Sequence, residues 1–298
     1  MPANKITGKM KLTVACLSIA LNLNENLIRL KIPDSHRNFL EGSTAEGEHA
    51  SAVFNELKIN LKNKPFITRD SELASLCKTE IWELWRTRSG EFLFIAPRLK
   101  PKRWALVDPE FCSGNLYLGS TNNNGEGVFP LQNLDMRIFV NWLANYNDLI
   151  LHAAGAAISG KGYAFIGSSG SGKSTLAETL FKQNHVTILG EDQVVLRYFD
   201  GRFWIFGTPW HERPEMCSTT GVPLEKLFIL DRESNQVISN LSPSASITRI
   251  LQTAFIPYYR HDRLLPLIDR LSLLSESIPI YKYAYKLGSD AVSLITTV

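Results

Sequence analysis

The 298-residue sequence predicts an α+β fold of two domains, the first mostly β and the second a mixed α/β core that contains antiparallel hairpins. The length supports two domains, because single hydrophobic cores stop growing near about 250 residues. Short segments rich in strand-forming residues, separated by turn formers, fill much of residues 1–127 and indicate the β domain. A glycine-rich loop between an apolar run and a helical pattern marks residues 128–298 as the α/β domain.

The first domain, residues 1–127, contains a series of candidate strands. They share alternating or continuous apolar residues: Lys11–Leu23, Leu27–Ile32, Ile81–Thr87, Glu91–Ala96, Arg103–Val107 and Asn115–Leu118. A turn at Asn24–Asn26 is expected to join the first two as a hairpin, and Val53–Ile59 fits either a helix or a strand. The run Thr121–Gly127 consists mainly of turn formers and predicts an exposed linker at the domain boundary.

The composition is that of an ordinary globular protein, with 44% hydrophobic and 20% charged residues. The net charge is only +3 and the Lys and Arg residues are dispersed, so no basic stripe indicates a nucleic-acid partner. No apolar run reaches the roughly 20 residues needed to span a bilayer. The four cysteines lie far apart without metal-ligand spacing, which favours free thiols in a reducing compartment. We therefore expect a cytoplasmic protein without nucleic-acid or membrane partners, and homo-oligomer formation is left open.

The second domain, residues 128–298, is expected to begin with an amphipathic helix over Leu131–Asn145. The other predicted strands of this domain are Leu149–Ile158, Tyr163–Ile166, Val186–Leu189, Val194–Phe199, Arg202–Phe206, Leu227–Leu230 and Ile278–Leu287. The other predicted helices are Thr175–Phe181, Ser244–Phe255 and Arg263–Leu274. Two hairpins are expected. A two-residue turn at Gly160-Lys161 joins Leu149–Ile158 to Tyr163–Ile166, and one at Asp200-Gly201 joins Val194–Phe199 to Arg202–Phe206. Antiparallel hairpins of this kind distinguish the domain from a parallel βαβ succession.

The loop Gly167–Ser174 reads Gly-Ser-Ser-Gly-Ser-Gly-Lys-Ser, which is the Gly-x4-Gly-Lys-Ser pattern of a P-loop. Its glycines allow positive φ, so that successive N–H groups can converge on phosphate oxygens at a helix N-terminus. Lys173 would reach the β- and γ-phosphates, and the Ser174 hydroxyl would ligate Mg²⁺. The alternative is a glycine- and serine-rich turn that caps a helix, with Lys173 in solvent. The predicted nucleotide-binding residues are Gly167, Ser169, Gly170, Ser171, Gly172, Lys173, Ser174 and Thr175, with ATP and Mg²⁺ as cofactors.

An acidic pair, Glu191-Asp192, follows the apolar strand Val186–Leu189. A strand that delivers carboxylates to the phosphates is a second signature of nucleotide sites, since the metal needs anionic ligands there. One carboxylate would hold Mg²⁺ beside Ser174, and the other would exchange a proton with the substrate. An acidic turn at a strand end is the alternative.

His152, in the first predicted hairpin, is a further candidate. A turn at Gly160-Lys161 pairs Ser159 with Gly162 and, further along the ladder, places His152 level with Ser169 in the loop. A role beside the phosphates and a purely structural role fit this position equally.

The segment Gly207–Pro214 leaves the second predicted hairpin as a loop rich in polar and rigid residues. Its His211 and Arg213 are candidate residues for the wall of a substrate site. A rigid connection around a packed Trp210 explains the same composition, and the residues alone do not separate the two.

Residues 148–210 resemble the catalytic domain of HPr kinase/phosphorylase, which is itself similar to phosphoenolpyruvate carboxykinase. The resemblance rests on the order of four segments: the His152 hairpin, the glycine-rich loop, the acidic pair and the second hairpin. It implies a P-loop kinase core of this type and Mg²⁺-ATP as the phosphoryl donor. It also implies that Asp192 transfers the proton, because Asp192 occupies the second position of the family's Asp-Asp pair. Glu191 replaces the first aspartate and would take its place at the metal.

The chain departs from that family in two places. It has no counterpart of the family's glycine-rich C-terminal signature, and residues 1–130 do not resemble its usual N-terminal domain. The chain looks more like the HPr-kinase-related proteins found beside peptide natural-product genes, some of which phosphorylate a serine of a precursor peptide. This resemblance implies a peptide or protein acceptor, which we expect the first domain to recognise.

These observations together predict a Mg²⁺-ATP-dependent kinase that transfers the γ-phosphoryl group to a hydroxyl, with serine of a peptide or protein as the leading acceptor. The predicted roles are catalytic for Asp192, His152 and Lys173, metal-binding for Ser174 and Glu191, and acceptor-binding for His211 and Arg213. Two alternatives remain: a nucleotide-binding regulatory or assembly module with ATPase activity, and a kinase for small-molecule hydroxyls.

Overall fold

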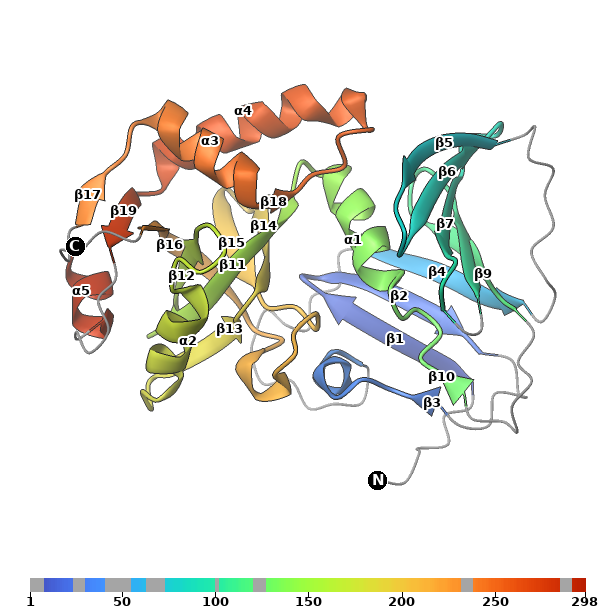
Figure 1. Ribbon diagram of the computed structural model, residues 1–298, viewed down its shortest axis with the longest axis horizontal. Helices are drawn as coiled ribbons and strands as arrows, with labels where there is room; N and C mark the ends of the chain where they lie inside the picture. Colours follow the sequence, from blue (N-terminus) through green and yellow to red (C-terminus); the bar gives the residue numbers. More distant parts are fainter. Residues whose placement is uncertain are drawn as a thin grey trace. The chain divides into compact units, whose positions relative to one another are not determined.

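The computed structural model describes most of the chain, namely residues 8–23, 30–40, 55–62, 73–99, 102–119, 127–231, 238–284 and 291–298. The described residues form two compact units, one up to Trp142 and the other from Leu143 onward. Each unit contains a large sheet together with helices, so the chain is a mixed α and β protein (Figure 1). We placed the domain boundary between residues 127 and 128, whereas residues 128–142 are grouped with the first unit. Of the predicted linker, only Gly127 lies within the described residues.

The first unit is built on an eight-stranded sheet in the order β1-β2-β4-β9-β8-β7-β6-β5. Its strands are β1 Lys9–Val14, β2 Leu17–Asn22, β4 Asn55–Lys62, β5 Leu73–Lys78, β6 Glu83–Thr87, β7 Phe92–Ala96, β8 Arg103–Val107 and β9 Ser113–Leu118. A parallel pair of β3 (Leu30–Lys31) with β10 (Gly127–Val128), a 3-10 helix η1 (Asp34–Phe39) and helix α1 (Asp135–Ala144) complete the described elements.

The start of this sheet differs from the prediction. The segment expected as one strand over Lys11–Leu23 is two strands, which turn back at Ala15 and Cys16 with φ values of 49° and 63°. Neither residue type indicates a turn, and apolar alternation continues through both strands, so the turn has no sequence signal. The predicted partner of this segment is also wrong, because Leu30–Lys31 pairs with β10 while β1 and β4 take both edges of β2. The expected turn at Asn24–Asn26 lies outside the described residues.

Two other predictions and one unpredicted strand of this unit can be compared with the structure. Of the ambiguous segment Val53–Ile59, the described residues from Asn55 onward lie in a strand, β4, whose residues alternate between buried and exposed positions. Strand β5 was not predicted, because its residues have no apolar alternation and none of them is buried. Helix α1 begins at Asp135, later than the predicted Leu131, because Leu131–Leu134 form turns before the helix.

The second unit contains a nine-stranded sheet in the order β12-β11-β14-β15-β16-β19-β17, with β13 and β18 joined to β11. Its strands are β11 Leu149–Ile158, β12 Lys161–Ile166, β13 Val186–Gly190, β14 Gln193–Phe199, β15 Arg202–Phe206, β16 Gly221–Asp231, β17 Ile238–Asn240, β18 Ala254–Phe255 and β19 Ile280–Ala284. Because β12 also pairs in parallel with β16, the strands β12, β11, β14, β15 and β16 close into a ring.

The hairpin of β11 and β12 forms, but its register differs from the prediction. Ile158 pairs with Lys161, so the turn residues are Ser159 and Gly160 rather than Gly160 and Lys161. Both have positive φ, 50° and 76°, as a tight hairpin turn requires, and glycine at the second position makes this turn cheaper than one with lysine there. The shift places His152 level with Gly167, the first residue of the loop, instead of Ser169.

The hairpin of β14 and β15 confirms the prediction, with Phe199 paired to Arg202 across Asp200 and Gly201. Both turn residues have positive φ, 54° and 72°. The other predicted strands of this unit occur at the expected places with different ends; β16, for example, begins at Gly221 rather than Leu227.

Helices lie on two sides of the second sheet (Figure 1). Helix α2 (Lys173–Phe181) and helix α5 (Ala291–Thr297) bury Leu180 and Ile295 in one apolar cluster with Phe165. Helix α3 (Pro243–Thr253) and helix α4 (His261–Ser277) contribute to a second cluster, which contains the inner residues of the strand ring. Helix α5 was not predicted. Within the described ranges, no helix is both long enough and apolar enough to cross a membrane.

Candidate functional site

The loop Gly167–Ser174 connects strand β12 to helix α2, so the predicted strand-loop-helix arrangement is present. Gly170 and Gly172 have positive φ, 73° and 100°, and Gly172 is the residue that caps the helix. A side chain at these positions would strain the backbone. Gly167 is closed in for another reason, since a Cβ there would lie 2.5 Å from Ser171 Oγ and 3.0 Å from the carbonyl oxygen of Leu230. The three glycines therefore fix the path of the loop onto the helix N-terminus.

Lys173 is folded back onto its own loop. Its Nζ donates to the carbonyl oxygens of Gly167 at 2.8 Å and Ser168 at 3.3 Å, and the residue is only 7% exposed. Burial lowers the pKa of Lys173, and the nearby Asp192 carboxylate opposes that shift. Lys173 is therefore a buried cation, which excludes the alternative of a solvated first-turn lysine.

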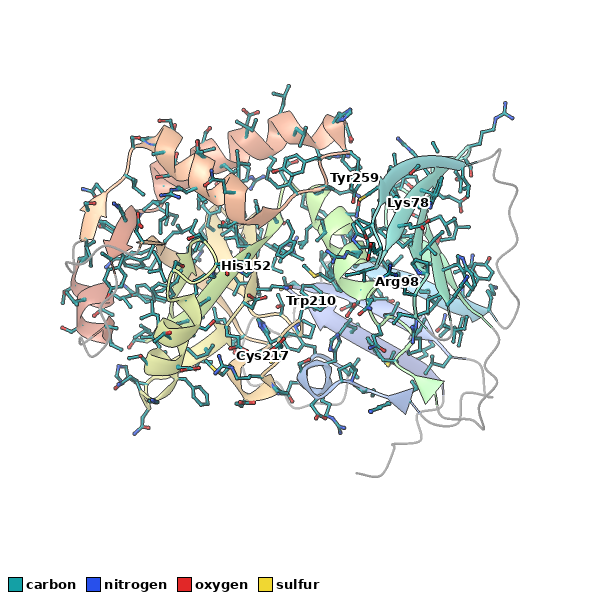
Figure 2. All side chains as sticks on the ribbon, in the orientation of Figure 1. Lys78, Arg98, His152, Trp210, Cys217 and Tyr259 are labelled. Atoms are coloured by element: carbon teal, nitrogen blue, oxygen red, sulfur yellow. The ribbon has the colours of Figure 1, made fainter. Side chains whose placement is uncertain are left out.

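His152 and Asp192 face each other next to this lysine. His152 Nδ1 lies 3.2 Å from Asp192 Oδ1, and the two side chains are 37% and 46% exposed. The contact follows from strand pairing, because His152 on β11 pairs with Gln193 at the start of β14 and the Ala153 amide donates to the Asp192 carbonyl. Since a carboxylate oxygen only accepts, the geometry favours the tautomer with its proton on Nδ1. Figure 2 shows His152 on β11.

The pKa of His152 reports the charges around it. Partial burial lowers this pKa below the ordinary value of 6.5, the Asp192 carboxylate raises it, and the Lys173 ammonium lowers it. His152, Asp192 and Lys173 therefore lie close enough to affect one another, although they come from three different elements. These are the three residues that we predicted to be catalytic.

Glu191, the other member of the acidic pair, is held by an arginine. It is 7% exposed, and its carboxylate accepts from the Arg213 amide at 3.3 Å, from Arg213 Nε at 2.7 Å and from Arg213 Nη2. Arg213 Nη1 donates to Glu178 Oε1 of helix α2 at 2.7 Å. These two carboxylates raise the pKa of the Arg213 guanidinium. Arg213, a predicted acceptor contact, is thus a bridge between two glutamates.

Arg213 belongs to the segment between β15 and β16. This segment runs back along β13, which brings Arg213 close to Glu191 at the end of β13. Gly190 forms a bridge with Cys217, and the Ser218 amide donates to the Leu189 carbonyl at 3.1 Å. Trp210 and Cys217 both belong to this returning segment (Figure 2). All four cysteines of the chain, which include Cys217, are free thiols.

His211, the other predicted acceptor contact, packs against Gly190. A Cβ at Gly190 would lie 2.6 Å from His211 Nε2. Thr208 Oγ1 donates to the Gln193 carbonyl at 2.9 Å, so the 3.1 Å contact between Thr208 Oγ1 and His211 Nε2 needs a proton on the imidazole. Burial lowers the pKa of His211 to about 4, so this histidine is neutral near pH 7. The contact of Thr208 with His211 could not be predicted, because Thr208 belongs to no recognisable motif.

The donor set fits a magnesium ion that is completed by phosphate and water. Ser174 is exposed in the first turn of α2, and Glu178, four residues later, lies on the same face of the helix. Because Arg213 connects Glu178 to Glu191, the Glu191 carboxylate lies on the side of α2 that carries Ser174. Among the described residues, no group of three or more His, Cys, Asp or Glu could hold a metal alone. Glu178 was missed, although its helical spacing from Ser174 is visible in the sequence.

The remaining predicted loop residues lie where the motif places them. Ser169 and Gly170 are exposed at the tip of the loop, while Ser171 is buried and Thr175 is half-buried in the first turn of α2. Ser171 Oγ has no hydrogen-bond partner within the described part of the chain, although its backbone N–H donates to the Ser168 carbonyl at 3.1 Å.

No family model matches the chain, and no curated protein matches it. Among solved structures, the Hpr(Ser) kinase/phosphatase from Coxiella burnetii is similar at 14% sequence identity, with a TM-score of 0.28 over 49% of this chain and 85% of that chain. A similarity at this level carries no argument about chemistry. The geometry of the loop and of the charged groups beside it is therefore the basis on which a function can be assigned.

Proposed function

We propose that this chain is a Mg²⁺-ATP-dependent phosphotransferase that moves the γ-phosphoryl group of ATP to an acceptor hydroxyl. The observation that carries the proposal is the pair of His152 and Asp192, which lies beside Lys173 at the N-terminus of α2. Nucleotide binding needs the loop and its lysine but no proton acceptor. A carboxylate beside a neutral imidazole at that place supplies a proton acceptor for transfer to a hydroxyl.

In this proposal the loop Gly167–Ser174 is a P-loop, and its N–H groups bind the phosphates. Lys173 now donates to two neutral carbonyls. Phosphate oxygens are charged acceptors and form stronger hydrogen bonds with an ammonium than carbonyls do. Bound ATP would therefore draw Lys173 from Gly167 and Ser168 to the β- and γ-phosphates.

We assign Ser174 and Glu191 to Mg²⁺. The ion, when bound, would neutralise charge on the β- and γ-phosphates. The Ser174 hydroxyl would hold it from the first turn of α2, and Glu191 would hold it from the end of β13. Because little covalent chemistry is left to the protein in phosphoryl transfer, these residues act by positioning and charge.

Asp192 is the proposed proton acceptor, with His152 as its positioning residue. The imidazole lies against Oδ1, and within the described part of the chain Oδ2 accepts one long side-chain hydrogen bond, of 3.4 Å, from Gln193 Nε2. The Asp192 side chain is 46% exposed, so Oδ2 is accessible to a hydroxyl. A positioned base contributes roughly 10²- to 10⁴-fold to such a step.

We propose serine in a peptide or protein as the acceptor, in a cytoplasmic setting. This part rests on the resemblance of residues 148–210 to HPr kinase/phosphorylase and related peptide kinases, and on the exposure of Asp192. His211 and Arg213 are engaged with Thr208 and with two glutamates, so the acceptor contacts are assigned to neither of them.

The test is incubation of the full chain with γ-labelled ATP, Mg²⁺ and candidate acceptor peptides, with Lys173→Ala and Asp192→Asn in parallel. We expect label on a serine, loss of ATP affinity by about tenfold or more in Lys173→Ala, and little change in ATP affinity in Asp192→Asn. Transfer by Asp192→Asn should fall by about 10²- to 10⁴-fold.

Other outcomes identify the alternatives. Free phosphate without a labelled acceptor would favour the regulatory module with ATPase activity, and a labelled small molecule would favour the small-molecule kinase. Unchanged ATP affinity in Lys173→Ala, measured by calorimetry, would contradict nucleotide binding at this loop. Full transfer by Asp192→Asn would contradict the assignment of the base.

A further inference from the structure

Arg213 holds two carboxylates with different parts of one guanidinium group. Nε and Nη2 face Glu191, which lies between β13 and β14, while Nη1 faces Glu178 on helix α2. The Arg213 backbone N–H adds a fourth contact, again to Glu191. The fork geometry of arginine suits this arrangement, which a lysine could not reproduce. Arg213 therefore ties the acidic pair to the helix that follows the glycine-rich loop.

The two carboxylates differ in their need for a cation. The Glu191 side chain is 8% exposed, whereas that of Glu178 is 51% exposed. A buried carboxylate without a counter-ion is costly, and an exposed one is hydrated at little cost. Arg213 is therefore the counter-ion of the buried Glu191 side chain, and its contact with Glu178 keeps the guanidinium near α2.

The place of this contact is also the place proposed for the metal. Glu191 is the carboxylate that we assign to Mg²⁺, and Ser174, the other assigned residue, is one helical turn from Glu178. Oε2 of Glu191 accepts from both Nε and Nη2 of Arg213, while Oε1 accepts from the backbone N–H, so a metal that binds Oε2 at normal distance has to displace the guanidinium. The guanidinium and the metal are thus alternative partners of one group.

The exposure and position of Arg213 are compatible with its displacement from Glu191. Its side chain is 35% exposed, and it precedes the short 3-10 helix η3 (Pro214–Met216) rather than lying inside a strand or a long helix. Its contact with Glu178 does not depend on Glu191, because it uses a different nitrogen. After displacement the guanidinium would keep one carboxylate partner at the mouth of the site.

We infer that Arg213 is the resident counter-ion of Glu191, that a divalent cation displaces it when Mg²⁺-ATP binds, and that Arg213 thereby sets the metal requirement of the site. This inference rests on the proposed function, since it takes Glu191 as the metal ligand. Arg213 is a positioning residue in this scheme. It orients the Glu191 carboxylate before the metal arrives, and it lowers the apparent affinity for the metal by competing with it.

The test uses Mn²⁺ as the probe, measured by electron paramagnetic resonance on the full chain with and without ADP. Arg213→Gln should bind Mn²⁺ on the order of tenfold more tightly than the wild type, since the competing cation is gone. It should also unfold at a lower temperature without metal, and Mn²⁺ should raise that temperature more than it does in the wild type. Arg202→Gln, at the far turn of the β14–β15 hairpin, is the matched control and should behave as the wild type.

Two further variants keep the test decisive. Arg213→Lys retains a cation without the fork, so its Mn²⁺ affinity should lie between those of the wild type and Arg213→Gln, and it serves if the glutamine variant does not fold. Glu191→Gln should abolish the effect of position 213 on Mn²⁺ affinity. If Arg213→Gln or Arg213→Lys bound Mn²⁺ no more tightly than the wild type, or if no form bound Mn²⁺ at all, the inference would be overturned. The proposed function fails separately, through the absence of ATP binding or transfer by the wild type.

Discussion

At the scale of single residues, the candidate site depends on how neighbouring charges set the protonation of His152. Partial burial and the Lys173 ammonium both favour the neutral imidazole, and the Asp192 carboxylate opposes them. Asp192 and Lys173 therefore shift the pKa of His152 in opposite directions. His211 also lies near Asp192, and its pKa of about 4 makes it neutral near pH 7.

We predict that His152 titrates below pH 6.5, so that it is neutral at pH 7 and gains a proton only in acid. Asp192→Asn should lower its pKa further, because the carboxylate that stabilises the imidazolium is removed. Lys173→Met should raise it, because a repelling charge is removed. The measurement is proton NMR of the imidazole signals, with the His152 resonance identified by its loss in His152→Gln. A pKa that moved the same way in both variants would contradict the arrangement of the three residues.

The same residues show why local sequence patterns indicated most members of the candidate site and missed one of its contacts. The loop, the acidic pair and His152 each follow a recognisable local pattern, and the structure brings them together. Arg213 was selected for a different reason, as a polar residue in a loop. Its partners come from residues 22 and 35 positions away, and no local pattern specifies an ion pair of that separation.

At the scale of elements, the second unit depends on how β11 is held to β14. Near its centre the pairing of His152 with Gln193 positions the candidate base. At its beginning, the Asp148 carboxylate accepts from Arg197 Nε at 2.8 Å and from the Tyr198 amide at 3.0 Å. The Asp148 and Arg197 side chains are only 1% and 5% exposed, so this contact is a buried ion pair. It fixes the register that carries His152 to Asp192.

We predict that Asp148→Asn lowers the free energy of unfolding by about 3 kcal/mol or more, because it leaves the charge of Arg197 buried without its carboxylate. Urea unfolding measures this change. Glu225→Gln is the matched control, since its pair with Lys161 is exposed, and it should cost less than about 1 kcal/mol. Equal stabilities of the two variants would show that the Asp148 pair does not hold these strands together.

Hairpins illustrate what sequence reasoning can and cannot supply for elements. Asp200-Gly201 supplies both residues that a tight turn favours, and the predicted register is correct. For the first hairpin, Gly160 fits either of two adjacent turns, and the wrong one was selected. The β1–β2 turn uses Ala15 and Cys16, two residue types that do not indicate a turn. The turn forms nevertheless, because burial of both strands outweighs the local cost of positive φ.

At the scale of the whole molecule, local patterns predicted the class of each part better than its connections. The alternation of apolar residues indicated a mostly β first part and hairpins in the second, which the structure contains. The pairing of β12 with β16, which closes the ring of strands, could not be predicted from the sequence. It joins segments about 60 residues apart, and their apolar residues carry no signal for the register. Helix α5 was missed because it is short and is stabilised by packing against α2 rather than by a local sequence pattern.

The closed ring of strands has a consequence for how the second unit exchanges its amide hydrogens with solvent. Strand β11 is paired along both edges, with β13 and β14 on one and β12 and β18 on the other. Its amides should exchange only through global opening, whereas those of Ser168 and Ser169 in the exposed loop should exchange through local motion. Strand β11, with the slowest amide exchange, and the glycine-rich loop, with some of the fastest, would then lie next to each other near His152. Deuterium uptake measured by mass spectrometry, with and without ATP, should accordingly show protection appearing in the loop while β11 stays unchanged.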